Sequence, residues 1–133
     1  MFWNELFHLV NCIPHNEMVV LAGDMNGHVG NSNVGYDGTH DGFGYGVRNA
    51  VSSRILEFAD GIHLVICNTL FMKKKSKLVT CVAGSVKSMV DYIIVLQRDR
   101  AKVRHIKVIA NEECMPKHKL LVMDMQFNTK KMA

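Results

Sequence analysis

The sequence predicts a single domain of α/β (α+β) class, with a mixed β-sheet and flanking helices. Short apolar runs bounded by turn residues recur along the chain and are typical of strands, whereas only two segments place apolar residues at helical spacing. The 133 residues include 48% hydrophobic residues and contain neither an internal repeat nor a linker, which suits one core. Strands joined mostly by short turns, with helices beside them, fit a layered fold.

The composition narrows the classes of function. Sixteen Lys+Arg against twelve Asp+Glu leave a formal net charge of +4, which permits DNA or RNA as a partner without requiring either. The four scattered cysteines form no C-x-x-C pair. Cys114 and His118 are four residues apart, but one such pair is weak evidence for a zinc site. We therefore expect reduced thiols. Because no leader and no long uncharged apolar run is found, we expect no membrane partner and an intracellular protein, nuclear or cytoplasmic.

The N-terminal segment predicts an amphipathic helix that stops at Pro14. Its apolar positions recur at helical spacing and are Trp3, Leu6, Phe7, Val10 and Ile13. A core helix needs other elements to cover it, so the abrupt start of the chain leads us to expect a truncated domain.

The rest of the chain is organised around residues 18–28. The apolar run over residues 18–22 predicts a buried strand that ends at Gly23. Asp24 and Asn26 then lie two residues apart, so an extended backbone would present a carboxylate and an amide on one side. Such a pair can hold or deprotonate a water, help to bind Mg²⁺ and contact a phosphoryl oxygen. The alternative is an Asp-x-Asn turn whose side chains bond to their own backbone.

A long loop is predicted for residues 31–50, which are rich in Gly, Asn and Asp. It carries Tyr36, Phe43 and Tyr45, and these aromatic rings beside Arg48 could stack on or clamp a nucleic-acid strand. The alternative is a glycine-rich surface loop with a few anchoring aromatic residues.

The remaining chain predicts a helix and several strands. The helix is expected to be capped by Ser52 or Ser53 and to end near Gly61. Lysines crowd residues 73–77 and form either a solvated turn or a source of phosphate contacts. A frayed tail is expected after residue 128. Strands are expected over residues 63–71, 77–82, 89–96, 103–109 and 118–127. A turn near residue 84 is expected to join the second of these strands to the third.

Motif-like segments follow one another in a fixed order. Gly23-Asp24-Met25-Asn26 follows the apolar run at residues 18–22, and later segments occupy residues 43–49, 55–59, 64–71, 78–80, 90–93 and 112–122. The first resembles the G-D-x-N motif of the endonuclease/exonuclease/phosphatase (DNase I-like) superfamily. The later segments resemble, in order, the motifs of its non-LTR retrotransposon-derived endonucleases. The resemblance covers nearly the whole chain.

The resemblance implies a fold and an activity. Residues 1–128 would be the C-terminal half of a four-layered α/β sandwich, and residues 129–133 would be a tail. Superfamily members are hydrolases that cut phosphoester bonds with Mg²⁺ or Mn²⁺. By position, Asp24 would be a metal ligand and would orient or deprotonate the attacking water, and Asn26 would hold the scissile phosphate.

The resemblance also implies roles for later residues. His118 would stabilise charge on the phosphoryl oxygens, and Asp91 would orient its ring. Substrate would be bound by Arg48, Asn49 and Asn68. The structural alternatives are a cap at a strand start for Asp91 and a surface histidine for His118.

Departures from the family pattern predict weak metal binding. The half that carries the principal metal-binding glutamate is missing, and Lys117 stands where an aspartate is common. Cys81 replaces a tryptophan. Three alternatives follow. The first is a Mg²⁺-dependent endonuclease or phosphodiesterase that is active only if another chain or a longer isoform supplies the missing half. The second is a degenerate fragment with at most weak nucleic-acid binding, and the third is a protein-interaction module. The chemistry favours the degenerate fragment. We also expect self-association, because a sheet without its partner sheet would expose an apolar face.

Overall fold

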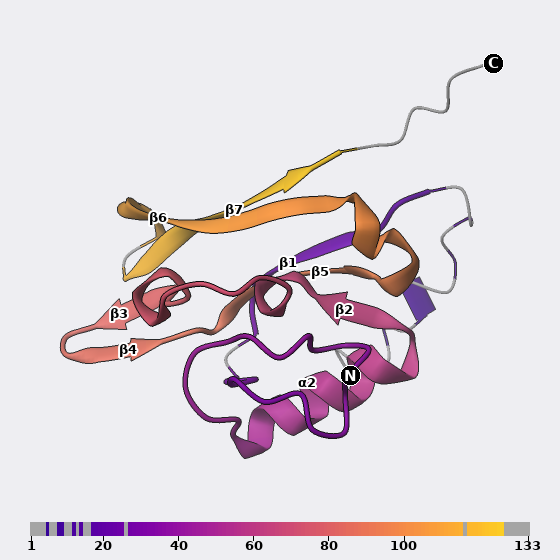
Figure 1. Ribbon diagram of the computed structural model, residues 1–133, viewed down its shortest axis with the longest axis horizontal. Coiled ribbons are helices and arrows are strands. Elements are labelled where there is room, and N and C mark those ends of the chain that lie inside the picture. Colours follow the sequence, from indigo (N-terminus) through magenta and orange to yellow (C-terminus); the bar gives the residue numbers. More distant parts are fainter. Residues whose placement is uncertain are drawn as a thin grey trace.

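The computed structural model describes residues 5, 8, 9, 12, 14, 17–25, 27–115 and 117–126. Within these residues, two sheets and the helix α2 (Ala50–Gly61) form an α+β fold, which confirms the predicted class (Figure 1). The apolar positions of the predicted N-terminal helix, Asn26 and the predicted tail lie outside the described residues.

The first sheet has the strand order β1-β5-β2, and both of its pairings are antiparallel. The strands are β1 (Val20–Asp24), β5 (Asp91–Leu96) and β2 (Leu64–Ile66). The apolar run at residues 18–22 was expected to form a buried strand, but most of β1 is exposed. Among the described strands β1 pairs only with β5, so it lies at a sheet edge. The register places Asp24 opposite Asp91.

The second sheet has the strand order β4-β3-β7-β6 and is also antiparallel. Its strands are β3 (Cys81–Ala83), β4 (Val86–Ser88), β7 (His118–Met125) and β6 (Val103–Met115). The turn at Gly84 joins β3 to β4 rather than to the strand at residues 91–96, so β4 was missed. Gly84 has a φ of +64°, which glycine adopts without strain.

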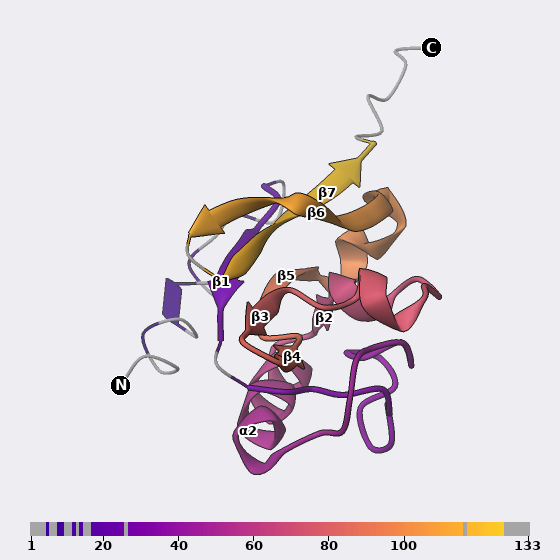
Figure 2. The ribbon, with the colours of Figure 1, turned by 90° about the vertical axis from the view of Figure 1, so that its left-hand side faces the viewer.

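The two sheets pack against each other through an apolar cluster. It contains Val65, Cys67, Ile93, Val95, Val103 and Ile106, with Leu121, Met123 and Met125 packed against it. Figure 2 shows β6 and β7 on one side of β5 and β2, and α2 on the other side. The chain therefore supplies its own second sheet, which covers the face that was expected to be exposed.

The N-cap of α2 lies three residues before Ser52, the first of the two predicted caps. Asn49 is the N-cap residue, and its Oδ1 accepts a hydrogen bond of 3.0 Å from the backbone N–H of Ser52. The Ser52 hydroxyl in turn accepts from the Asn49 N–H at 3.1 Å, which completes a capping box. The apolar face is as predicted, because Ile55, Leu56 and Ala59 are buried against the first sheet.

Within the described ranges, three short 3₁₀ helices lie in or between the predicted strands. They are η1 (Cys67–Thr69), η2 (Lys75–Lys77) and η3 (Gln97–Lys102). The strand predicted for residues 63–71 therefore ends at Ile66, where the Thr69 hydroxyl donates to the Ile66 carbonyl oxygen at 2.7 Å. This turn directs Asn68 toward β5, which matters for the site described below.

The long loop before α2 is fixed to the core by a buried histidine. His40 places Nε2 2.7 Å from the Gly30 carbonyl oxygen, and its Nδ1 accepts a hydrogen bond of 3.0 Å from the Gly42 N–H. Burial lowers the pKa of His40, which favours the neutral ring that this pair of contacts requires. The loop is thus an ordered part of the fold.

Candidate active site

Three of the predicted catalytic residues meet where the two sheets adjoin. Asp24 ends β1, Asp91 begins β5 and His118 begins β7. His118 Nδ1 lies 2.8 Å from Asp91 Oδ2, and His118 Nε2 lies 3.7 Å from Asp24 Oδ2. One ligand atom from each residue lies within 4.8 Å of the others. Residues far apart in the sequence thus form one cluster of two carboxylates and an imidazole.

The contact with Asp91 sets the state of the His118 ring. Because a carboxylate only accepts hydrogen bonds, Nδ1 must carry a proton, and Nε2 is directed toward Asp24. The hydrogen bond to Asp91 raises the pKa of His118, and the charges of Asp91 and Asp24 raise it further, against the opposing effect of burial. The ring can therefore carry a positive charge between the carboxylates and offer Nε2–H to an anion.

The start of β5 is held by two side chains that are themselves buried. Asn68 donates from Nδ2 to the Asp91 carbonyl oxygen at 2.9 Å, and its Oδ1 accepts from the Ile93 N–H at 3.1 Å. The Thr80 hydroxyl accepts from the N–H groups of Val90 and Asp91. The Asp91 carboxylate is thus aimed by its backbone. Thr80 belongs to the motif-like segment at residues 78–80, but no local pattern predicts this role for it.

Tyr92 is a second positioning residue that sequence reasoning missed. Its buried hydroxyl lies 2.6 Å from the Gly27 carbonyl oxygen and 2.7 Å from the Met89 carbonyl oxygen, and it accepts a hydrogen bond from the Val29 N–H at 3.1 Å. These contacts fix the segment that follows Asp24 to the start of β5. The alternation of a strand gives Tyr92 an inward direction but does not identify its partners.

The residues predicted to bind substrate make contacts within the fold. Arg48 donates to the carbonyl oxygens of Ser32 and Val34, and its guanidinium lies 5.2 Å from the centre of the Tyr36 ring. Asn49 caps α2 and also accepts from the His28 N–H. Asn68 holds β5, as described above. Substrate binding by Arg48, Asn49 and Asn68 stays a prediction, and Asn26 lies outside the described residues.

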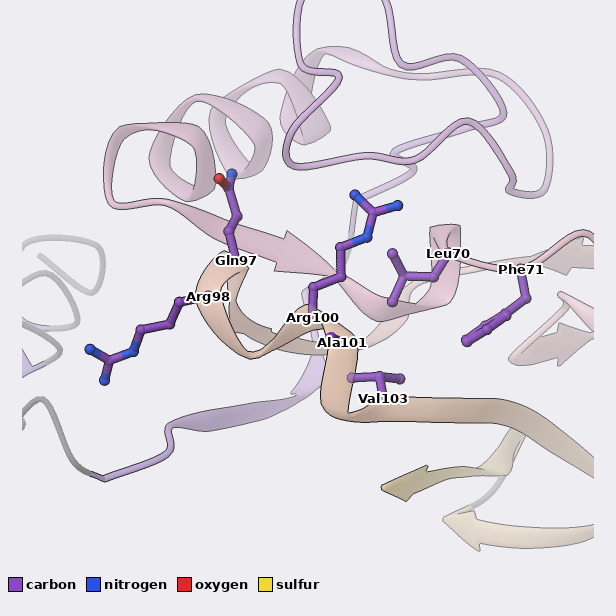
Figure 3. A pocket seen from close by; sticks show the side chains of 7 residues that line it. All are labelled: Leu70, Phe71, Gln97, Arg98, Arg100, Ala101 and Val103. Carbon is purple, nitrogen blue, oxygen red and sulfur yellow. The ribbon is translucent and has the colours of Figure 1, made fainter. Parts of the chain in front are cut away.

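Two cavities differ in their relation to the site. One of about 240 Å³ lies beside Asp24 and Asp91 and is lined otherwise by residues of β1, β5 and β7. A larger one of about 390 Å³ lies at the opposite end of β5, around Gln97 and Phe71 (Figure 3). There Arg98 and Arg100 point away from each other, and Arg100 forms an ion pair of 2.6 Å with Asp41. Of these two cavities, the smaller one therefore adjoins the candidate catalytic residues.

Comparison with known proteins adds one relationship. The chain is 34% identical over 123 residues to Craniofacial development protein 2 of Bos taurus, covering 91% of this chain and 20% of that protein. It is 33% identical over 123 residues to the protein of that name from Tragulus javanicus, covering 21% of it.

The chain thus spans about a fifth of the length of these relatives. The motif-like segments also resemble the craniofacial development protein 2-like group, and the similarity to these two relatives supports this resemblance alone. No family model matches the chain. Among the described residues, none of the helices combines the length and the apolar composition that spanning a bilayer requires.

Proposed function

We propose that this chain carries the catalytic half of a metal-dependent phosphodiesterase that cuts nucleic acid, of the retrotransposon-derived endonuclease/exonuclease/phosphatase type. The observation that supports this proposal most directly is the His118–Asp91 pair at 2.8 Å, with the Asp24 carboxylate 3.7 Å from the other ring nitrogen. The site lies at the junction of two sheets and adjoins a cavity. An intracellular location, nuclear or cytoplasmic, belongs to the same proposal.

The three side chains have complementary roles in this proposal. Asp24 orients a water and accepts its proton as the water attacks phosphorus. The bond from phosphorus to the leaving oxygen breaks, and that oxygen takes a proton from solvent. His118 offers Nε2–H to a phosphoryl oxygen and stabilises the charge that develops there, while Asp91 keeps the ring in the required orientation. Phosphoryl transfer depends mainly on in-line positioning and charge stabilisation, and the cluster offers both.

The described residues fit Mg²⁺ or Mn²⁺ through a single oxygen donor group. Mg²⁺ in such enzymes binds one or two carboxylates and completes its shell with waters and substrate phosphates. Asp24 provides such a carboxylate, whereas Asp91 is bound to His118. The metal would supply positive charge to the transferring phosphoryl group. We therefore expect weak metal affinity without substrate.

Nicking of supercoiled plasmid tests the proposal. The purified chain should nick plasmid in Mg²⁺ or Mn²⁺ and not in EDTA, and Asp24→Ala and His118→Ala should each lower the rate by about 10²–10⁴-fold. Asp37→Ala is the matched control, because Asp37 is exposed on the loop before α2. Absence of nicking by the unaltered chain, or nicking that persists in both site variants, would contradict the proposal.

A second candidate function is nucleic-acid binding without catalysis. Lys73, Lys77 and Lys107 line a small cavity together with Asn68, whose side chain contacts β5 at the site. Burial lowers the pKa of Lys73, and the charges of Lys77 and Lys107 lower it further. Like charges held this closely are relieved when an anion binds, which favours a phosphate backbone as the partner.

Replacing these lysines should weaken nucleic-acid binding more than replacing a lysine elsewhere. We expect Lys77→Glu and Lys107→Glu each to lower the affinity for a labelled DNA duplex and to reduce the salt dependence of binding by about one phosphate contact. Lys87→Glu is the control, because Lys87 is exposed on β4. Fluorescence anisotropy over a range of NaCl concentrations measures both quantities. Equal losses in all three variants would argue against a localised phosphate-binding surface.

Self-association also belongs to the proposal, but through the edge of β1 rather than through an exposed sheet face. The sheet face is covered, but β1 pairs only with β5 among the described strands, and Val20 on it is 46% exposed. A strand edge of this kind can pair with a second copy of the chain or with another protein, as the interaction-module alternative requires. Light scattering tests this point, and a monodisperse monomer at all concentrations would exclude self-association.

A further inference from the structure

A fully buried histidine joins two parts of the loop that precedes α2. His40 Nε2 lies 2.7 Å from the Gly30 carbonyl oxygen, and His40 Nδ1 accepts a hydrogen bond of 3.0 Å from the Gly42 N–H. A ring that accepts at Nδ1 and donates from Nε2 is one particular neutral tautomer of histidine. The two contacts therefore depend on the protonation state of this single side chain.

Protonation would turn the acceptor of this pair into a donor. An imidazolium carries a proton on both ring nitrogens, so Nδ1–H of His40 would face the Gly42 N–H. Two donors directed at each other in the protein interior leave both without an acceptor, which is unfavourable where water has no access. His40 can thus take up a proton only if its contact with Gly42 breaks.

The surroundings of His40 favour the neutral ring. Burial lowers the pKa of His40 most, and the backbone hydrogen bond of Nε2 raises it. The charge of Arg48 lowers the pKa and that of Asp41 raises it. Asp41 also forms an ion pair of 2.6 Å with Arg100 of η3, and Asp60 of α2 lies 3.5 Å from the hydroxyl of the residue before His40. The helix η1 contacts this part of the loop through a hydroxyl and a carbonyl, which carry no charge.

The residues that follow the histidine are held against Gly30 by close backbone contacts. Residues 42–46, named the glycine–aromatic segment below, alternate three glycines with two aromatic residues. Gly44 lies so near that an added Cβ would overlap the Gly30 carbonyl oxygen, and the Asn31 N–H donates to the Gly46 carbonyl oxygen at 3.1 Å. The glycines at both ends of the segment have positive φ, which suits them as points of rotation.

We propose that His40 is a pH-sensitive attachment point, whose neutral ring holds the glycine–aromatic segment to Gly30 and whose protonation releases the segment. Release would let Phe43 and Tyr45 move on the glycines that flank them. The attachment does not require that the chain be a nuclease.

Neighbouring contacts should survive the release, because they use other groups. The Val29 N–H donates to the Tyr92 hydroxyl at 3.1 Å, and burial raises the pKa of Tyr92, so this hydroxyl stays protonated. The Ile66 N–H donates to the Thr39 carbonyl oxygen at 2.8 Å. These two amides are therefore internal references for a local opening.

Hydrogen exchange of backbone amides, measured by NMR on the whole chain, tests the attachment. Because the pKa of His40 is lowered from about 6.5 in the closed loop, the attachment is fully stable above about pH 6.5 and weakens as pH falls. Between pH 6.5 and 5.5, the protection factors of the Gly42 and Asn31 amides should fall by about two- to fivefold. The protection factors of the Val29 and Ile66 amides should stay constant.

His40→Gln removes the titrating group, so protection of the Gly42 and Asn31 amides should no longer depend on pH in this range. His63→Asn is the matched control and should behave as the unaltered chain, because His63 is exposed and has a positive φ that asparagine tolerates. A fall that persists in His40→Gln, an equal fall at Val29, or constant protection at Gly42 in the unaltered chain would overturn the proposal.

If His40→Gln does not fold, as judged by circular dichroism, the ring of the unaltered chain provides the second measurement. Its ¹⁵N shifts should show a neutral His40 with the proton on Nε2 at pH 7.5. Protonation of the ring on acidification should accompany the loss of protection at Gly42. A ring that becomes protonated while the Gly42 amide stays protected would reject the attachment.

Discussion

Replacing Asp91 with asparagine is expected to lower the pKa of His118 and to slow plasmid nicking by about 10²–10⁴-fold. The substitution removes the hydrogen bond and the negative charge that stabilise the imidazolium. An amide can also donate to Nδ1 and thereby favour the other ring tautomer. The backbone of Asp91 stays anchored by Asn68 and Thr80, so the fold should persist. Titration of the His118 ring protons by NMR, beside nicking assays, measures both effects.

The raised pKa of His118 also makes the difference in unfolding free energy between the unaltered chain and Asp91→Asn depend on pH. A histidine whose pKa is raised on folding adds stability that is fully present below its unfolded-state pKa, about 6.5, and is lost as pH rises through the folded-state value. The unaltered chain should therefore exceed Asp91→Asn in unfolding free energy most at mildly acidic pH, and less as pH rises. Asp37→Asn serves as the control. An unchanged His118 pKa in Asp91→Asn would refute the assignment.

Replacing Gly44 with alanine should destabilise the fold by about 3 kcal/mol or more. A Cβ at this position would lie 2.0 Å from the Gly30 carbonyl oxygen and 3.2 Å from Met89 Cε. The first contact is with backbone, so relief requires a shift of the chain rather than of a flexible side chain. The same carbonyl oxygen contacts His40 Nε2, and the shift would disturb that contact too.

Urea unfolding followed by circular dichroism measures this effect. Gly61→Ala is the matched control, because an added Cβ there meets open space at the end of α2, and its effect should stay within about 0.5 kcal/mol. If Gly44→Ala costs less than about 1 kcal/mol, the close approach of the loop to Gly30 is not as rigid as the structure indicates.

The local sequence pattern was sufficient to predict the positions of most helices and strands. It was insufficient to predict how they pair and which of them are buried. The apolar spacing identified α2 and the strands β1, β5, β6 and β7, because periodicity reflects which face is covered. It did not show that β1 lies at an edge, since burial depends on pairing with distant strands. The cap of α2 was misplaced because Asn49 and Ser52 both favour capping, and only the backbone decides which residue takes the N-cap position.

The site was predictable as a set of residues but not as a geometry. The order of the motifs selected Asp24, Asp91 and His118, and the structure places these three together. Their distances depend on the register of β1 with β5 and on the packing of β7, which no local pattern specifies. The motif pattern identifies Cys81 only as a replacement for a tryptophan. Its position beside His118 emerged from strand pairing.

The location of the His118–Asp91 contact gives it a second consequence. Asp91 belongs to the first sheet and His118 to the second, so the hydrogen bond is also a tether between two layers that pack through an apolar cluster. Asp24 of the first sheet faces the other nitrogen of the same ring. Apolar packing is nondirectional and tolerates sliding, whereas a hydrogen bond fixes one alignment. If the two sheets shifted relative to each other, the His118–Asp91 hydrogen bond would break before the backbone hydrogen bonds within either sheet. The activity of the site would then depend on the alignment of the sheets rather than on the secondary structure.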